Sequence, residues 1–115
     1  MYLWRPDRAQ VASVGVAIDK ARTAALYRRP SKDFEDQAGH GRPSALHLAH
    51  AVPLQGGVPV VHRGHVIAAV GVSGASSADE DNELAELAAD AAAAAARAGD
   101  RDARVGHAAV PAAAR

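Results

Sequence analysis

Apolar residues in the first quarter of the chain recur with the spacing of a helix. Four of them in the segment 13–27 follow one another at i, i+4, i+7 and i+11, which predicts a helix with one buried face. The residues of this face are Val14, Ile18, Ala21 and Ala25. Two arginines and Pro30 come next and suit the end of a helix. Ser31 then predicts the N-cap of a second, short helix over residues 32–38.

The pattern changes from helical to β-rich in the middle of the chain. Residues 39–57 carry glycine and proline at short intervals, which predicts a loop with one helical turn. Residues 58–62 and 65–72 are rich in valine and flank a two-residue turn, which predicts a β-hairpin. Because the second strand is almost wholly apolar, we expect it to be covered on both faces.

A long helix is expected after the hairpin. The tetrapeptide SADE, which begins at Ser77, is a capping box, and it predicts a helix over residues 78–98 that ends at Gly99. Its expected apolar face contains Leu84, Leu87 and Ala88. Residues 100–115 consist mostly of Ala, Arg and Asp without a period, which predicts a disordered tail. The sequence therefore indicates one domain over residues 1–99 followed by a tail.

The composition narrows the class of protein. A chain of 115 residues suffices for one domain with one small core. The net charge of zero offers no basic surface to nucleic acid or to an anionic membrane. The absence of cysteine removes disulfides, thiolate nucleophiles and thiolate metal sites. No apolar stretch reaches the ~20 residues that span a bilayer, and the N-terminus is unlike a signal peptide, so we expect a cytoplasmic protein.

Three segments of the chain resemble one protein family. They read AIDKARTAALYRRPSKDFED, PLQGGVPVV and GHVIAAVGVSGA, and they occur in the family's order. They look like the GlcG/HbpS-like family of haem-binding and haem-degrading proteins, a module that is also the C-terminal domain of PduO-type corrinoid adenosyltransferases. The resemblance implies a profilin-like α+β fold, in which helices flank a five-stranded antiparallel sheet, and frequent assembly into oligomers.

The resemblance also implies a module that is short at its N-terminal side. Family members usually carry a long helix and a hairpin before the helix that here begins near Ser13. Residues 2–6 are the segment that is able to add a strand. Since a small sheet would leave apolar surface uncovered, we expect the chain to form a homo-oligomer.

Candidate ligand-binding residues lie on the first predicted helix and in the Gly-Gly turn. Lys20, Thr23 and Tyr27 follow at i, i+3 and i+7, and the lysine and threonine suit a carboxylate or haem propionate. An equally weighted interpretation is a boundary face whose lysine reaches water. Gly56 and Gly57 permit close approach of a ligand to the backbone, although a tight turn explains them as well.

The histidines of the central part of the chain offer two further candidates. If haem binds, His47 or His50 is the expected iron ligand, because scaffold-held loops often carry function and imidazole commonly ligates haem iron. A polar loop that happens to be rich in histidine is the simpler interpretation. His62 and His65 face each other across the hairpin turn, but two ligands without a third make a weak metal site. We therefore predict a solvated hairpin tip and no metal site.

The sequence favours a module that binds haem or another small, flat, anionic ligand. One alternative is a lyase or isomerase that acts on a small aromatic or hydroxy acid, with Lys, Thr and His in acid–base roles. Another alternative is a purely structural subunit of an oligomer. No nucleophile with an adjacent base is visible, so no catalytic residue is predicted. The expected partners are a small molecule and further copies of the chain, with neither nucleic acid nor a membrane.

Overall fold

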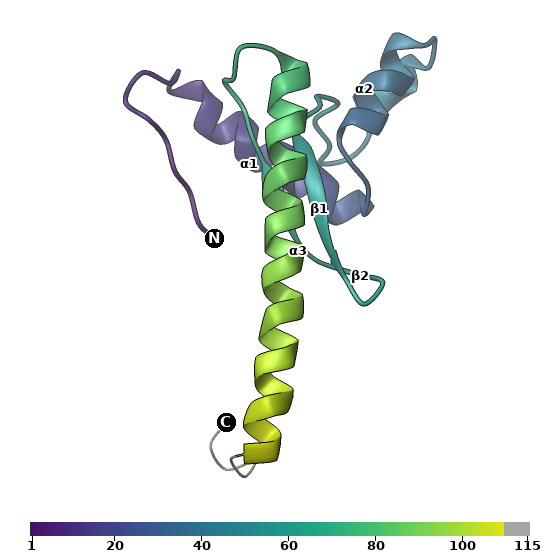
Figure 1. Cartoon of the computed structure of the whole chain (residues 1–115). Coiled ribbons are helices and arrows are strands. Elements are labelled where there is room, and N and C mark those ends of the chain that lie inside the picture. The colour runs from purple at the N-terminus through teal and green to yellow at the C-terminus, as the bar shows by residue number, and fades with distance from the viewer. Residues whose placement is uncertain (110–115) are drawn as a thin grey trace.

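The computed structural model describes residues 1–109 of the chain, with side chains through residue 102. It contains an antiparallel hairpin and helices on both sides of it, so the predicted α+β class is confirmed (Figure 1). The elements in chain order are helix α1 (Ala12–Tyr27), helix α2 (Lys32–Gly39), the short 3₁₀ helix η1 (Pro43–His47), strands β1 (Gly57–His62) and β2 (His65–Gly71), and helix α3 (Ala78–Ala109).

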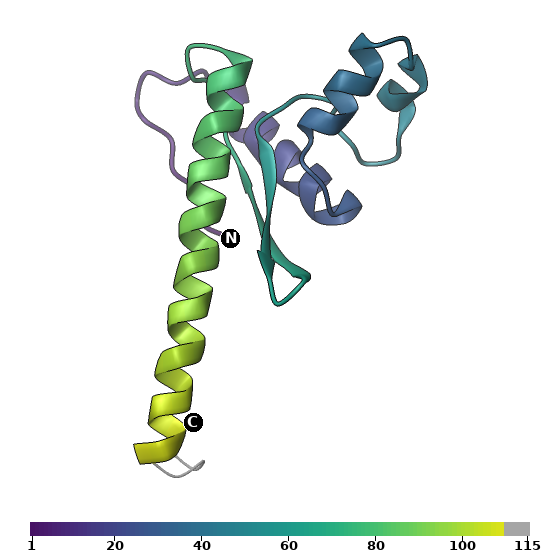
Figure 2. The same cartoon turned by 45° about the vertical axis from the view of Figure 1, so that its right-hand side comes forward.

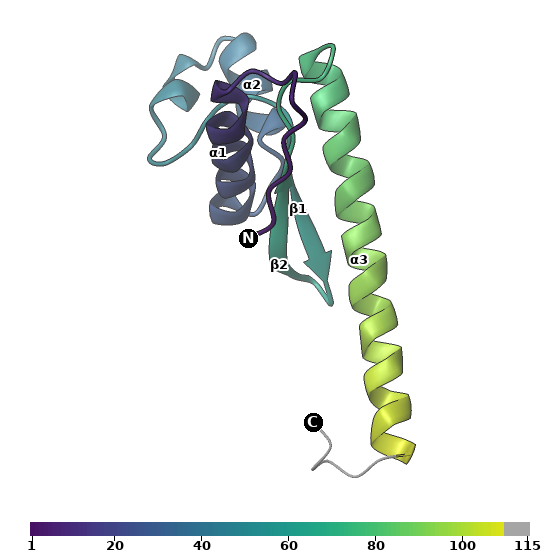
Figure 3. The same cartoon turned by 90° about the vertical axis from the view of Figure 1, so that its left-hand side faces the viewer.

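The hairpin is the centre of the fold. Its two strands pair from Gly57 opposite Gly71 to His62 opposite His65, with a register shift after Val60. Arg63 (φ 52°) and Gly64 (φ 76°) form the connection, and two positive φ angles are the mark of a primed turn. Figure 3 shows the hairpin between α1 on one side and α3 on the other. The predicted hairpin is therefore confirmed.

The buried face of α1 differs from the predicted one. Its buried residues are Ser13, Lys20, Thr23 and Ala24. Of the four predicted core residues, Ala25 is exposed and the other three are only half-buried. The cause lies in the strands: a Cβ at Gly57 would collide with the carbonyl oxygen of Lys20, and one at Gly71 with that of Ala17. The helix backbone thus rests on two glycines, and the polar side chains beside this contact become buried.

The prediction that the second strand is covered on both faces is wrong. No residue of β2 is buried, and Ile67 is 53% exposed. The reason is that α3 lies mainly along β1 and leaves much of β2 uncovered. Residues 2–6 do not add a strand, and the side chains of Tyr2 and Trp4 are exposed. Within residues 1–109 the sheet therefore has two strands.

Helix α3 begins as predicted but is longer. The Ser77 Oγ accepts a hydrogen bond from the Glu80 N–H at 3.0 Å, which confirms the N-cap. The helix does not end at Gly99 but continues to Ala109, well past the hairpin (Figure 2). In the structure the helix thus includes residues 100–109, which the sequence assigned to a disordered tail, and residues 110–115 lie outside the described part. An interior glycine costs a helix only about 1 kcal/mol, and the alanines around it are the best helix formers.

The face that α3 turns to the core also differs from the prediction. Leu87 is 67% exposed and Leu84 is 42% exposed, whereas the buried residues of this helix are Asp81, Asn82, Ala85 and Ala89. The small alanines let the helix lie close to β1, and Asp81 at its start contacts groups outside the helix. The buried apolar residues, Ala24, Phe34, Ala45, Val60, Ala85 and Ala89, form the thin core that the composition indicates. No helix within residues 1–109 has the length and hydropathy needed to cross a membrane.

Candidate functional site

Lys20 lies in the interior, where it joins three segments. Its Nζ donates to Asp81 Oδ2 at 3.0 Å and to the carbonyl oxygen of Val72 at 3.0 Å. The two charged side chains are only 4% and 9% exposed. The other oxygen of Asp81 accepts a hydrogen bond from the Ala75 N–H at 2.8 Å. The lysine therefore ties α1 to the start of α3 and to the end of the hairpin.

The two glycines singled out in the sequence lie directly against Lys20. A Cβ on Gly56 (φ +121°) would lie 2.6 Å from the Val72 oxygen and 3.0 Å from Lys20 Nζ. Gly57 faces the backbone of Lys20, as described above. The fold thus brings these three predicted residues together, and they contact one another within the protein. Their role toward a ligand stays a prediction.

Thr23 and Tyr27 hold the loop that carries the central histidines. The fully buried Thr23 hydroxyl donates to the Asp19 carbonyl and accepts from the Val52 N–H, both at 2.8 Å. The Tyr27 hydroxyl donates to the carbonyl oxygen of Ala49 at 2.5 Å. These bonds fix the chain on both sides of His50, which has a positive φ of 55°. Each of the two side chains therefore makes one hydrogen bond to the loop.

The predicted haem ligands His47 and His50 are exposed at this loop. His47 ends η1, and neither histidine lines the grooves described below.

Ser31 behaves differently from the prediction, since its side chain makes no helix-capping bond. Its buried Oγ instead donates to the Leu54 carbonyl at 2.6 Å and accepts from the Gly57 N–H at 2.9 Å. Ser31 therefore holds the segment that leads into β1. This contact is long-range, and the position of Ser31 in the sequence does not reveal it.

Two buried amide side chains flank the start of α3. Gln55 Nε2 donates to Asp79 Oδ1 at 2.9 Å, and Asn82 Nδ2 donates to Glu86 Oε1 at 3.0 Å. The Oε1 of Gln55 and the Oδ1 of Asn82 have no hydrogen-bond partner within the described residues. The second bond holds the carboxylate of Glu86, which is part of a groove wall.

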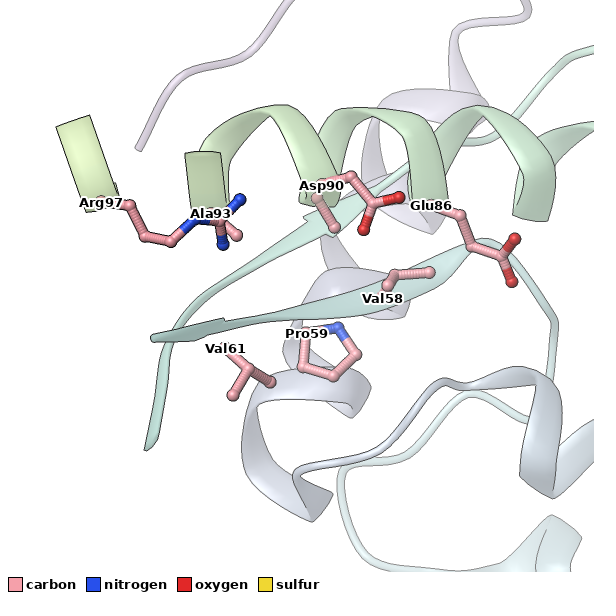
Figure 4. A pocket seen from close by; sticks show the side chains of 8 residues that line it. Val58, Pro59, Val61, Glu86, Asp90, Ala93 and Arg97 are labelled. Carbon is pink, nitrogen blue, oxygen red and sulfur yellow. The ribbon is translucent and has the colours of Figure 1, made fainter. Parts of the chain in front are cut away.

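A groove of about 390 Å³ runs between β1 and α3 (Figure 4). Aliphatic side chains from both elements form its apolar part, and charged side chains of α3 border it. The residues on β1 are Val58, Pro59 and Val61, and those on α3 are Glu86, Ala89, Asp90, Ala93 and Arg97. The α3 residues recur at helical spacing, so a single face of the helix forms one wall of the groove.

A second cavity, of about 400 Å³, adjoins the groove at the hairpin tip. It shares Val61 and Arg97 with the groove. Its other lining residues are charged or titratable, and they are His62, Arg63, Asp100 and Arg101. Asp100 Oδ2 lies 2.6 Å from His62 Nε2 and 3.0 Å from Arg63 Nη2. This cavity combines three guanidinium groups and an imidazole with one carboxylate.

Sequence reasoning found only His62 among these charged residues. Asp100 and Arg101 fall in the segment that was predicted to be a disordered tail, and Arg97 was not singled out. The signal that identifies them is the spacing of residues 97, 100 and 101. If the helix continues through Gly99, this spacing places the three residues on one face of the helix. His65 is exposed opposite His62 and does not line the cavity. Among residues 1–102, whose side chains the structure describes, no group of three or more His, Cys, Asp or Glu is arranged to hold a metal ion.

One ionisable side chain of α2 has a clearly shifted pKa. Lys32 Nζ donates to both carboxylate oxygens of Asp36, at 2.9 and 3.1 Å. This hydrogen-bonded carboxylate raises the pKa of Lys32 above its usual value, and Asp79 and Glu35 add to the effect through their negative charge. The pair lies on the surface, away from the groove lining.

The geometry can be compared with that of known proteins. A family model described as "Haem degrading protein HbpS-like" matches residues 1–90. Protein GlcG of Escherichia coli strain K12 is 42% identical over 71 residues, which are 62% of this chain and 53% of GlcG. The chain thus spans about half the length of this curated relative.

Solved structures show the same fold. HbpS of Streptomyces reticuli, solved as a double mutant, superposes with a TM-score of 0.67 and 31% identity over 76% of this chain and 60% of that one. PduOC, solved in complex with haem, superposes with a TM-score of 0.63 and 26% identity over 75% of this chain and 66% of the other. The resemblance inferred from the three sequence segments is therefore confirmed, and the chain belongs to the HbpS-like family.

Proposed function

We propose that this chain is a small-ligand-binding module that takes a flat, anionic molecule of the haem class in the groove between β1 and α3. The observation that carries the proposal is the division of the groove into an apolar part and an arginine-lined end. The complex of PduOC with haem and the family's description as haem-degrading support the same class of ligand.

The groove has the size of a small-molecule site, and part of its wall is apolar. Its volume of about 390 Å³ lies within the range of roughly 300–1,000 Å³ found for ligand pockets. Val58 and Val61 on the strand, with Ala89 and Ala93 on the helix, offer apolar surface on two sides. A flat apolar body seated here would release water from both walls, which is the main driving force for such binding.

The lining residues also fit the remaining chemistry of haem. Haem, when bound, would supply a redox-active iron and carry two carboxylates. Arg97 belongs to both cavities and suits a carboxylate, because a guanidinium forms paired hydrogen bonds with one. His62 is the imidazole in the lining, whereas His47 and His50 lie on the exposed loop. Single substitutions of these three histidines would therefore identify which of them is the iron ligand.

A haemin titration followed by absorbance tests the proposal. A Soret shift that saturates at one haem per chain is expected. Ala93→Leu, which places a larger side chain in the groove, should weaken binding by about tenfold or more, since overpacking typically costs ~1–3 kcal/mol. Ala92→Leu is the matched control, because Ala92 is an exposed neighbour that does not line the groove. Absence of binding by the unmodified chain would refute the proposed function.

The enzyme alternative has no specific support in the described geometry. The lysine and threonine that would do acid–base work, Lys20 and Thr23, are buried and hydrogen-bonded to internal partners. The module is therefore proposed as a binding protein.

The proposal includes a homo-oligomer. β2 pairs only with β1 within residues 1–109, and exposed apolar residues lie on β2 and α3, including Ile67 and Leu87. An unpaired strand edge beside apolar surface favours pairing with another chain. Light scattering should give a mass above the 11.8 kDa of one chain, and Ile67→Glu should lower it. A monodisperse species of one chain mass for the unmodified protein would contradict the proposal.

A further inference from the structure

We propose that the cavity at the hairpin tip is a carboxylate-binding subsite, and that Asp100 occupies it when no ligand is bound. This inference rests on the proposed function, since the subsite would receive the anionic end of the molecule that lies in the groove. The observation that supports the inference is the position of Asp100 Oδ2, which lies 2.6 Å from His62 Nε2 and 3.0 Å from Arg63 Nη2.

The charges that line the cavity are unbalanced. Arg63, Arg97 and Arg101 bring three permanent positive charges, and Asp100 is the one carboxylate among the lining residues. Arginine is the side chain best suited to a carboxylate, because its planar guanidinium presents paired donors and keeps its charge at any physiological pH. The cavity therefore has more donors for a carboxylate than one aspartate uses.

Rigid elements position these donors. Arg97 and Arg101 are one helical turn apart on α3, and both line the cavity. Arg63 belongs to the two-residue turn, where its positive φ of 52° fixes the direction in which its side chain leaves the hairpin. The turn and the helix thus place these three guanidinium groups around one cavity, and Arg63 contacts Asp100 directly.

The connection to the groove defines the ligand class. Val61 and Arg97 line both cavities, so the groove passes directly into the basic cavity. A ligand that fills both spaces has a flat apolar body and a carboxylate at one end. Its carboxylate would replace that of Asp100 at His62 and Arg63, while Arg97 and Arg101 add further donors.

A small dicarboxylate tests the subsite without any porphyrin. Succinate is titrated at constant ionic strength, with sodium chloride and succinamide as controls, and binding is followed in two-dimensional amide NMR spectra. We expect saturable shifts confined to residues 61–65 and 97–101. Asp100→Asn removes the internal carboxylate and should tighten succinate binding several-fold. Arg63→Gln should weaken it by roughly tenfold, as for loss of a hydrogen bond to a charged group.

Arg22→Gln is the matched control for the arginine variant. Arg22 is exposed on α1 and pairs with Asp19 at 3.2 Å, with an exposure of 57% against 63% for Arg63. This control should bind succinate like the unmodified chain. The inference would be overturned if the two segments showed no shifts, or if sodium chloride caused the same shifts as succinate. The contacts of Asp100 would then have a purely structural role. If Asp100→Asn fails to fold, the Arg63→Gln variant still decides the question.

Comparison of haemin with its dimethyl ester separates the inference from the proposed function. If haemin binds, Arg63→Gln and esterification of the carboxylates should each weaken binding. Binding of haemin that neither change affects would overturn the subsite and leave the groove proposal in place. Localised succinate binding without any haemin binding would support the subsite and refute the haem-class ligand.

Discussion

Lys20 and Asp81 are 61 residues apart in the sequence and form an ion pair in the interior, with 3.0 Å between Nζ and Oδ2. Lys20→Met would leave the Asp81 carboxylate buried without its partner. The expected loss of unfolding free energy is about 3–5 kcal/mol, measured by chemical denaturation. The surface variant Arg22→Met breaks an exposed pair and should change stability by less than about 1 kcal/mol.

The double variant Lys20→Met, Asp81→Asn should recover part of that loss. It leaves no buried charge, and the asparagine can still accept the hydrogen bond from the Ala75 N–H. A single variant Lys20→Met that is as stable as the unmodified chain would show that the pair does not hold α1 against α3.

Gly57→Ala should destabilise the protein because its new Cβ would meet the carbonyl oxygen of Lys20. The helix must then move away from the hairpin, which we expect to cost about 1–3 kcal/mol in thermal or chemical unfolding. Gly15→Ala is the control, since no heavy atom lies within 4 Å of a Cβ placed there. That helical variant should be more stable by about 0.5–1 kcal/mol. Equal effects of the two substitutions would argue against the close approach of α1.

Gly99→Ala should raise stability by about 0.5–1 kcal/mol, because this residue lies inside α3 and a Cβ there meets no atom within 4 Å. The helical signal in circular dichroism should rise with it. If the helix instead ended at Gly99 with a left-handed residue, alanine would lower the stability. The sign of the change therefore decides between the two structures.

Ser77→Ala removes the oxygen that accepts from the Glu80 N–H at the start of α3. The expected loss is about 1 kcal/mol in chemical denaturation. Ser76→Ala is a suitable control, since Ser76 is an exposed neighbour outside this hydrogen bond. Equal losses in the two variants would place the cap elsewhere.

The ion pair of Lys32 should weaken on the alkaline side. The Asp36 carboxylate raises the pKa of Lys32 in the folded protein. The stabilisation is therefore fully present below the ordinary lysine pKa and is lost as the pH rises through the higher folded value. An NMR titration of the Lys32 side chain should show a lower pKa in Asp36→Asn. An unchanged midpoint would mean that the two side chains do not pair in solution.

The sequence by itself determined the local elements of this protein. The helix before Pro30, the primed hairpin and the cap at Ser77 depend on residues within a few positions of one another, so short-range patterns predict them well. The resemblance of three segments to the GlcG/HbpS-like family was sufficient to identify the fold class.

The tertiary structure decided which faces are buried and which residues meet. Two strand glycines bring the backbone of α1 against the hairpin, so Lys20 and Thr23 are buried in place of the predicted apolar stripe. Burial of a helix face depends on the surface it packs against, and that surface is distant in the sequence. Asp100 reaches the hairpin tip for the same reason: α3 continues past Gly99 because its alanine-rich segment tolerates one glycine, and only packing along β1 places its charges beside His62.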